Sequence, residues 1–442
     1  MTEVLQRFTN VRPKEIAPLL ASAFFFFCVL TALMVLRPAR DALGMRGGLD
    51  AVRWLFIGTA VVTLMVNPVF GFLVSRFRRL RFIATTYLFF GGSLLVFWWV
   101  LTFAPQTTGE TSGRVFYVWF SVFNLFSTMV FWALMADRFS LEQSKRLFGV
   151  IAVGGTLGAI AGPSLAALLA QPLGTANLLL VSVGFLFLAI GAAWAVALLQ
   201  PERSEDAGDP DAPPAVDEDE IIGGSAWEGF RAVFASRYLL GIATFVLILA
   251  VMATFLYFTR LQMVAALGDD LDMRTTVFAQ IDLITQIATL VLQLIVTGHL
   301  MRRLGVAVTL ALLPITVLLG FIGLAIAGTL IALVIFEALF KAVQRAVMRP
   351  ARETLFTVVS REDKYKSKAF IDTFVYRAGD VTGAWTEGLL GRLGMGLAAL
   401  ATLAVPLALV WAALGIWLGR TQSRIARERA EVVRRGAGAT MV

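Results

Sequence analysis

The chain has 442 residues, of which 58% are hydrophobic and only 15% are charged, with a net charge of +8. So little charge excludes an ordinary soluble domain. Apolar runs longer than 18 residues recur along the chain, which predicts membrane-spanning helices. A single cysteine, Cys28, and a single histidine, His299, exclude a disulfide and a cysteine- or histidine-rich metal site. We therefore expect no metal and no cofactor.

Twelve spans are predicted. The first apolar run, Ile16 to Leu36, follows three basic residues and has no small-residue cleavage pattern after a short core, so it is a span and not a signal peptide. Aromatic residues within it, Phe24 to Phe27, are expected to face lipid. The twelve spans lie at about 16–36, 52–74, 82–104, 114–136, 147–170, 177–199, 238–259, 275–298, 304–327, 329–349, 366–389 and 396–419.

Basic residues gather in alternate loops. The loop between spans two and three carries four arginines, whereas the turns between spans five and six and between spans nine and ten carry no lysine or arginine. Because basic loops stay on the cytoplasmic side, both termini are predicted to be cytoplasmic. The positive net charge is thus expected to face anionic lipid, and no nucleic-acid partner is predicted.

The chain divides into two halves around a polar linker. Residues 201–225 contain four prolines and the acidic run 217–220, which is typical of a disordered cytoplasmic tether. The predicted domains are therefore an N-terminal six-helix bundle (1–200), the linker (201–225), an amphipathic segment with a C-terminal six-helix bundle (226–420), and a basic cytoplasmic tail (421–442). Residues 226–237 are expected to lie on the membrane surface.

The two halves repeat short motifs. The basic turn Arg78-Arg79-Leu80 recurs as Arg302-Arg303-Leu304, and the glycine pair 158 and 162 recurs as 379 and 383 at the same spacing. Glycines four residues apart, here 154, 158 and 162, let helices approach closely. This arrangement resembles the major facilitator fold, an all-α membrane protein with twelve transmembrane helices in two pseudo-symmetric six-helix bundles. The resemblance implies that spans one, four, seven and ten line a central cavity.

Charged residues recur at four-residue spacing along span ten: Glu337, Lys341, Arg345 and Arg349. That spacing puts all four on one helix face. At about 1.5 Å per residue, Glu337 would lie near the middle of the membrane, where a charge needs a partner helix or water. Glu337 can neutralise Lys341, which leaves the face cationic and predicts an anionic solute. Alternatively, Arg349 and Arg352 extend to the cytoplasmic surface.

Further charges lie in or at the ends of other spans, and together with the stripe they form the candidate substrate-binding set. Arg37 and Arg40 could be interface anchors, although Pro38 is expected to break or kink the helix and aim both inward. Asp137 and Arg138 could instead only cap span four. Asp372 and Arg377 could be a structural pair, and Arg377 can also pair with Asp380 at i,i+3. Asp282 lies in an apolar sequence away from any interface, so a buried partner or a proton site is expected for it. The set is Arg37, Arg40, Asp137, Arg138, Arg260, Asp282, Glu337, Lys341, Arg345, Asp372, Arg377 and Asp380.

Three segments resemble the nucleotide transporter (ATP/ADP antiporter) family. They are residues 36–43 (LRPARDAL), 131–148 (FW, then A, then EQSKRLF) and 366–379 (KSKAFID, then RAG). The resemblance implies a divergent bacterial member, in the inner membrane, that exchanges nucleotides through buried basic and acidic residues. Arg40 stands where the family has a basic residue, and Asp282 lies on a helix that carries one of its acids. Asp380 departs from the pattern, because the family has a lysine there.

These patterns predict a secondary transporter. An anionic organic solute, with a nucleotide or phosphorylated metabolite as candidates, would bind between the halves and move by alternating access. A transporter or flippase of an anionic lipid and a non-transporting scaffold or receptor are the alternatives. An enzyme is not predicted, because no phosphate loop, metal spacing or nucleophile with a base is found. The expected partners are the solute and membrane lipids, and the chain is expected to be a monomer.

Overall fold

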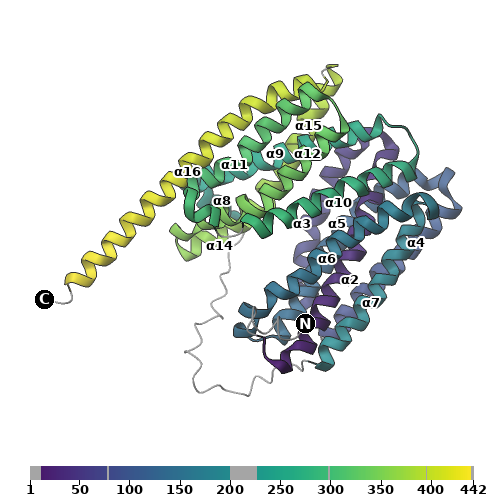
Figure 1. Ribbon diagram of the computed structural model, residues 1–442, viewed down its shortest axis with the longest axis horizontal. Coiled ribbons are helices and arrows are strands. Elements are labelled where there is room, and N and C mark those ends of the chain that lie inside the picture. The colour runs from purple at the N-terminus through teal and green to yellow at the C-terminus, as the bar shows by residue number, and fades with distance from the viewer. Residues whose placement is uncertain (1–10, 77–78, 200–225, 297–298, 395, 440–442) are drawn as a thin grey trace. The chain divides into compact units, whose positions relative to one another are not determined.

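The computed structural model describes residues 11–76, 79–199, 226–296, 299–394 and 396–439, and all secondary structure in them is helical. The chain forms two compact units (Figure 1). The first lies within residues 1–216 and 264–283, and the second within residues 217–263 and 284–442. The predicted linker, residues 201–225, lies outside the described residues. Residues 264–283, which include the start of the predicted eighth span, group with the first unit.

The first unit contains the first six long helices. They correspond to predicted spans one to six, and α2 packs against α5, α6 and α7. The first part of α10 (Leu271–Val296) completes the unit. The helices are α2 (Ile16–Gly44), α3 (Gly48–Arg76), α4 (Arg79–Phe103), α5 (Pro105–Arg138), α6 (Leu141–Leu173) and α7 (Leu178–Leu199), with short 3₁₀ turns at Pro13–Glu15, Met45–Gly47 and Thr175–Asn177.

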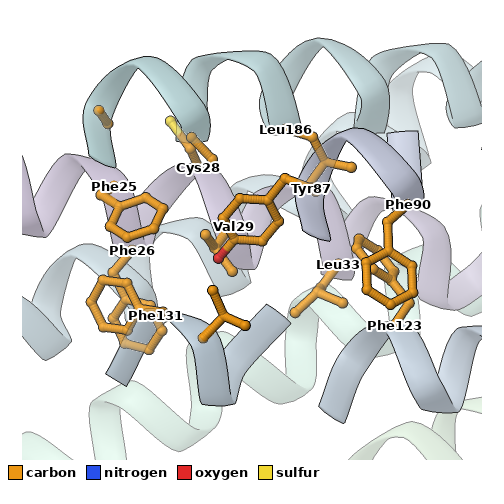
Figure 2. Packing of buried hydrophobic residues seen from close by; sticks show 14 of the residues in the cluster. Phe25, Phe26, Cys28, Val29, Leu33, Tyr87, Phe90, Phe123, Phe131 and Leu186 are labelled. Carbon is orange, nitrogen blue, oxygen red and sulfur yellow. The ribbon is translucent and has the colours of Figure 1, made fainter. Parts of the chain in front are cut away.

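Aromatic side chains fill the core of the first unit (Figure 2). Phe26 of α2 stacks on Phe131 of α5 with ring centroids 4.1 Å apart, and the buried hydroxyl of Tyr87 donates to the carbonyl oxygen of Ser127 at 3.1 Å. The expectation that residues 24–27 face lipid is therefore wrong for Phe25 and Phe26, which are buried, while Phe24 is exposed. A continuous aromatic run covers every side of a helix, so part of it must enter the core.

The second unit contains six further long helical segments, and two of them are interrupted by π-helical turns. The elements are α8 (Ala226–Ala235), α9 (Arg237–Ala265), the rest of α10, α11 (His299–Ala327), α12 (Leu330–Val343), the π turn η4 (Gln344–Met348), α13 (Arg349–Leu355), the 3₁₀ turn η5 (Phe356–Val358), α14 (Arg361–Phe370), the π turn η6 (Ile371–Val375), α15 (Tyr376–Arg392) and α16 (Leu397–Ala439). The helix α16 continues to Ala439 beyond the other helices of its unit (Figure 1), so the basic tail prolongs span twelve.

The helical segments confirm the predicted fold class. Among the described residues, nine helical stretches are long and apolar enough to cross a membrane, and one of these, Pro13–Val66, covers α2 and much of α3. The segments α12–α13 and α14–α15 are not among the nine because they carry several charges. Pro38 does not break α2, which runs through it to Gly44. A proline removes one hydrogen bond, and membrane helices tolerate this.

Glycines allow helices to approach closely in both units, as the recurrence of the glycine pair in the two halves of the sequence predicts. A Cβ atom at Gly158 would lie 2.4 Å from the carbonyl oxygen of Phe27, and one at Gly162 would lie 2.6 Å from the Cβ of Met34. In the second unit, a Cβ at Gly379 would lie 2.8 Å from the carbonyl oxygen of Leu247. The recurring motif therefore specifies the same type of contact twice: α2 on α6, and α9 on α15.

This contact gives a stability prediction. We expect Gly158→Ala to lower the free energy of unfolding by about 2 kcal/mol, because the added methyl group meets backbone that cannot move aside without shifting α2. Gly184→Ala is the matched control: nothing lies within 4 Å of a Cβ there, so helix propensity alone should make it neutral or slightly stabilising. Denaturant unfolding of the detergent-solubilised protein measures both. Equal stability of the two variants would contradict the close contact.

Candidate functional site

Three charged side chains meet inside the second unit. The guanidinium of Arg260, near the end of α9, donates to Oε1 of Glu337 at 3.0 Å, and the ammonium of Lys341 donates to the same oxygen at 2.5 Å. The Arg260 side chain is 1% exposed and the Glu337 side chain 4%. The predicted pairing of Glu337 with Lys341 one helical turn on is confirmed. A buried carboxylate that accepts hydrogen bonds from two cations forms a strong ion cluster that is largely shielded from water.

The π turn η4 alters the predicted stripe. Arg345 lies inside this turn, where its guanidinium donates to Oε1 of Gln286 on α10 at 2.5 Å. A π turn closes over five residues and not four, so residues beyond it rotate away from the original face. Arg349 is accordingly exposed. The stripe therefore consists of Glu337, Lys341 and Arg345, and it lies in the same unit as Arg260.

A second group of charges lies in the first unit. Arg37 on α2 approaches Asp282 on α10, with Nε 3.6 Å from Oδ2, and the Asp282 side chain is 2% exposed. One turn further along α2, Arg40 donates to Oδ1 of Asp41 at 2.5 Å and lies over the ring of Tyr117 at 4.5 Å. The cation–π contact and the carboxylate together hold the guanidinium among apolar groups. Both predicted arginines of α2 thus have partners within the unit.

The remaining candidates lie at helix ends and in α15. Arg138 is buried in the last turn of α5, next to the partly exposed Asp137. Asp372 accepts from Arg352 at 3.0 Å, and Asp380 accepts from Arg377 at 3.2 Å, which is the predicted i,i+3 pair. The structure thus brings the twelve candidates into separate clusters in each unit.

The sequence did not identify the neutral side chains that hydrogen-bond to charged residues in these helices. Gln286 accepts from Arg345, Thr254 donates to Asp380 at 3.4 Å, and Gln262 donates to Glu387. Amides and hydroxyls are common in membrane helices and carry no charge pattern, so composition cannot single them out. The one available signal is position, because each occurs in a helix that also carries a candidate ion.

One ion pair joins the segments beyond the membrane-spanning part of α12. Lys368 of α14 donates to Oε2 of Glu353 on α13 at 2.6 Å. Partial burial raises the pKa of Glu353, but the hydrogen bond from Lys368 and the charges of Lys368 and Arg352 outweigh this, so its pKa lies below the usual 4.5. A depressed folded-state pKa contributes stability above the unfolded pKa and loses it as the pH falls through the folded pKa.

The pair predicts a pH-dependent effect. We expect Glu353→Gln to lower the free energy of unfolding at pH 7 by less than about 1 kcal/mol, because the pair is partly exposed. The difference from the parent should shrink below about pH 4.5 as the native carboxylate becomes protonated. Thermal unfolding across pH 3 to 7 measures this. Lys368→Gln should give the same profile, and a difference that grows in acid would contradict the pairing.

Comparisons with known structures support the same fold. A peptide transporter POT in complex with sulfate has a TM-score of 0.61 at 14% identity, over 91% of this chain and 95% of that chain. A bacterial homolog of the human lysosomal transporter Spinster, in an inward-facing and unoccupied conformation, has a TM-score of 0.60 at 13% identity, over 94% and 99%. The nucleoside transporter NupG has a TM-score of 0.58 at 13% identity, over 92% and 98%.

A comparison with protein families assigns most of the chain. No curated protein matches the sequence. Residues 19–348, however, match the family described as Major Facilitator Superfamily, and this range covers both basic clusters on α2 and α12. The family consists of transporters and not enzymes, in agreement with the prediction from the motifs. The chain therefore belongs to the Major Facilitator Superfamily and is a multi-pass membrane protein that acts as a secondary transporter.

Proposed function

We propose that this transporter carries an anionic organic solute. The observation that carries the proposal is a group of three cations on spanning helices: Arg260 and Lys341, which share the carboxylate of Glu337, and Arg345, which donates to Gln286. Desolvated cations in a membrane protein are costly and mark solute pathways. Arginine also offers a planar fork that matches carboxylate and phosphate oxygens.

A nucleotide or phosphorylated metabolite is the solute that the sequence favours. The segments at 36–43, 131–148 and 366–379 resemble the nucleotide transporter family, and Arg40 occupies a position that is basic in that family. We further propose that the chain acts as a monomer in the inner membrane of a bacterium, with both termini in the cytoplasm. The alternating distribution of basic loops supports this orientation.

Glu337 suggests how the empty site is stabilised. Without solute, its carboxylate holds Arg260 and Lys341, so neither cation lies buried without a counter-charge. An entering phosphate would compete for Lys341, whose side chain is 17% exposed and is the more accessible of the two cations. We propose that this exchange of partners couples solute binding to alternating access.

Uptake into proteoliposomes tests the proposal. Purified protein would be reconstituted and supplied with radiolabelled nucleotides, sugar phosphates and dicarboxylates, and empty liposomes give the background. We expect saturable uptake or exchange of at least one anion. A folded protein that moves none of these anions but transfers a labelled anionic lipid between leaflets would instead establish the lipid-transporting alternative.

A further inference from the structure

An apolar groove runs along the outside of the second unit. Its volume is about 440 Å³, and α8, α9 and the segment from α14 into α15 form its walls. Along α9 the lining residues recur at three- and four-residue spacing, so one helix face lines the groove over about two turns. Its lining residues include Phe230, Phe234, Leu240, Phe370, Phe374 and Ala378.

The wall between α8 and α14 is built from phenylalanines. The ring centroids of Phe230 and Phe234 lie 4.5 Å apart, and those of Phe230 and Phe370 lie 5.8 Å apart. Phe370 stacks on Phe374 with a centroid distance of 5.6 Å. Gly229 brings the two helices together, because a Cβ there would lie 2.6 Å from the carbonyl oxygen of Lys366. The groove is thus a built feature with a fixed aromatic wall, yet Phe234 is 58% exposed.

Two exposed arginines are close in sequence to residues that line the groove. Arg231 follows Phe230 on α8, and Arg237 is the first residue of α9, three residues before Leu240. A short helix with exposed aromatic residues and an arginine is typical of a segment that lies at the membrane surface. Only Ser236 separates α8 from the apolar helix α9. If α8 lies at the membrane surface, the groove would begin at the level of the lipid headgroups and continue along α9 into the acyl region.

We propose that this groove binds one anionic phospholipid. An acyl chain would occupy the apolar channel, and the phosphate would lie against Arg231 and Arg237. The elongated form along α9, the exposed phenylalanines and the adjacent arginines match the two chemistries of such a lipid. A small soluble anion would use the arginines and leave the apolar walls exposed to solvent, so the lipid is the occupant that accounts for both features.

Native mass spectrometry of the full-length protein tests the proposal. The protein would be released from nanodiscs that contain equal amounts of phosphatidylglycerol and phosphatidylcholine, and the lipids retained would be identified. Each basic residue near a membrane surface strengthens binding of anionic lipid several-fold. We therefore expect one retained phosphatidylglycerol, favoured about tenfold over phosphatidylcholine.

Matched variants separate this groove from the rest of the lipid-facing surface. Ala378→Phe fills the groove and should reduce retention at least fivefold, while Ala325→Phe, at an exposed position on α11, should not. Arg231→Gln with Arg237→Gln should abolish the preference for phosphatidylglycerol, whereas Arg424→Gln with Arg429→Gln, with the same charge change, should preserve it. If Ala378→Phe fails to fold, Ala378→Leu replaces it. Unchanged retention in the groove-filled variant, or no preference in the parent, would overturn the proposal.

Discussion

Replacing Glu337 with glutamine should lower the free energy of unfolding by about 3 kcal/mol, the typical cost of breaking a buried ion pair. The glutamine has nearly the same size, so the loss would come from charge alone. Arg260, whose side chain is 1% exposed, would keep its charge in an apolar environment after losing the oxygen to which it donates at 3.0 Å. Lys341 would lose the same partner.

Denaturant titration in a fixed detergent measures this effect. Glu362→Gln is the control, because that carboxylate also pairs with a lysine at i,i+4 but is 72% exposed, and exposed pairs contribute less than about 1 kcal/mol. Arg260→Met in the Glu337→Gln background should recover part of the loss, since it removes the uncompensated charge. A Glu337→Gln protein as stable as the control would mean that solvent reaches the cluster.

Replacing Arg345 with glutamine should reduce anion uptake about tenfold or more. A hydrogen bond that involves a charged group contributes about 1.5–3 kcal/mol. Since about 1.4 kcal/mol corresponds to a factor of ten in affinity, losing one such bond to the solute should lower uptake by about that factor or more. Arg345 lies one turn beyond Lys341 and donates to the amide oxygen of Gln286 at 2.5 Å. Its planar guanidinium is suited to bind phosphate or carboxylate oxygens.

Arg349→Gln provides the matched control for uptake. It removes the same charge from the same helical segment, but Arg349 lies beyond the π turn and is exposed, so its loss should change uptake less than about twofold. Arg345→Lys should retain a fraction of the activity, because lysine keeps the charge without the planar fork. Equal losses in Arg345→Gln and Arg349→Gln would show that uptake depends on net charge and not on this cluster.

Regular periodicity explains which parts of this molecule were predictable. The pairs Glu337–Lys341 and Arg377–Asp380 follow from helical spacing alone, since residues three or four apart share a face. The lengths of the apolar runs predict the spans. The repeated glycines predict close helix contacts, and the structure shows which residues lie opposite them. These features depend on local geometry, which sequence specifies directly.

Long-range partners and helical irregularities were not predictable in the same way. Asp282 was expected to have a buried partner, but nothing in its neighbourhood identifies Arg37, which lies on a different helix. The π turn at Gln344–Met348 has no sequence signature, and it moves Arg349 off the face that strict four-residue spacing assigns to it. Pro38 was expected to break or kink the helix, and α2 continues through it without a break.

The most direct test of an anion carrier compares one solute with and without its charge. Proteoliposomes containing the purified protein would receive labelled adenosine 5′-monophosphate, adenosine 5′-triphosphate or uncharged adenosine, each at the same concentration. Because Arg260, Lys341 and Arg345 lie on spanning helices of the second unit, we predict protein-dependent uptake of a phosphorylated form and none of adenosine. Uptake of adenosine alone, or at the same rate as the phosphorylated forms, would contradict the account.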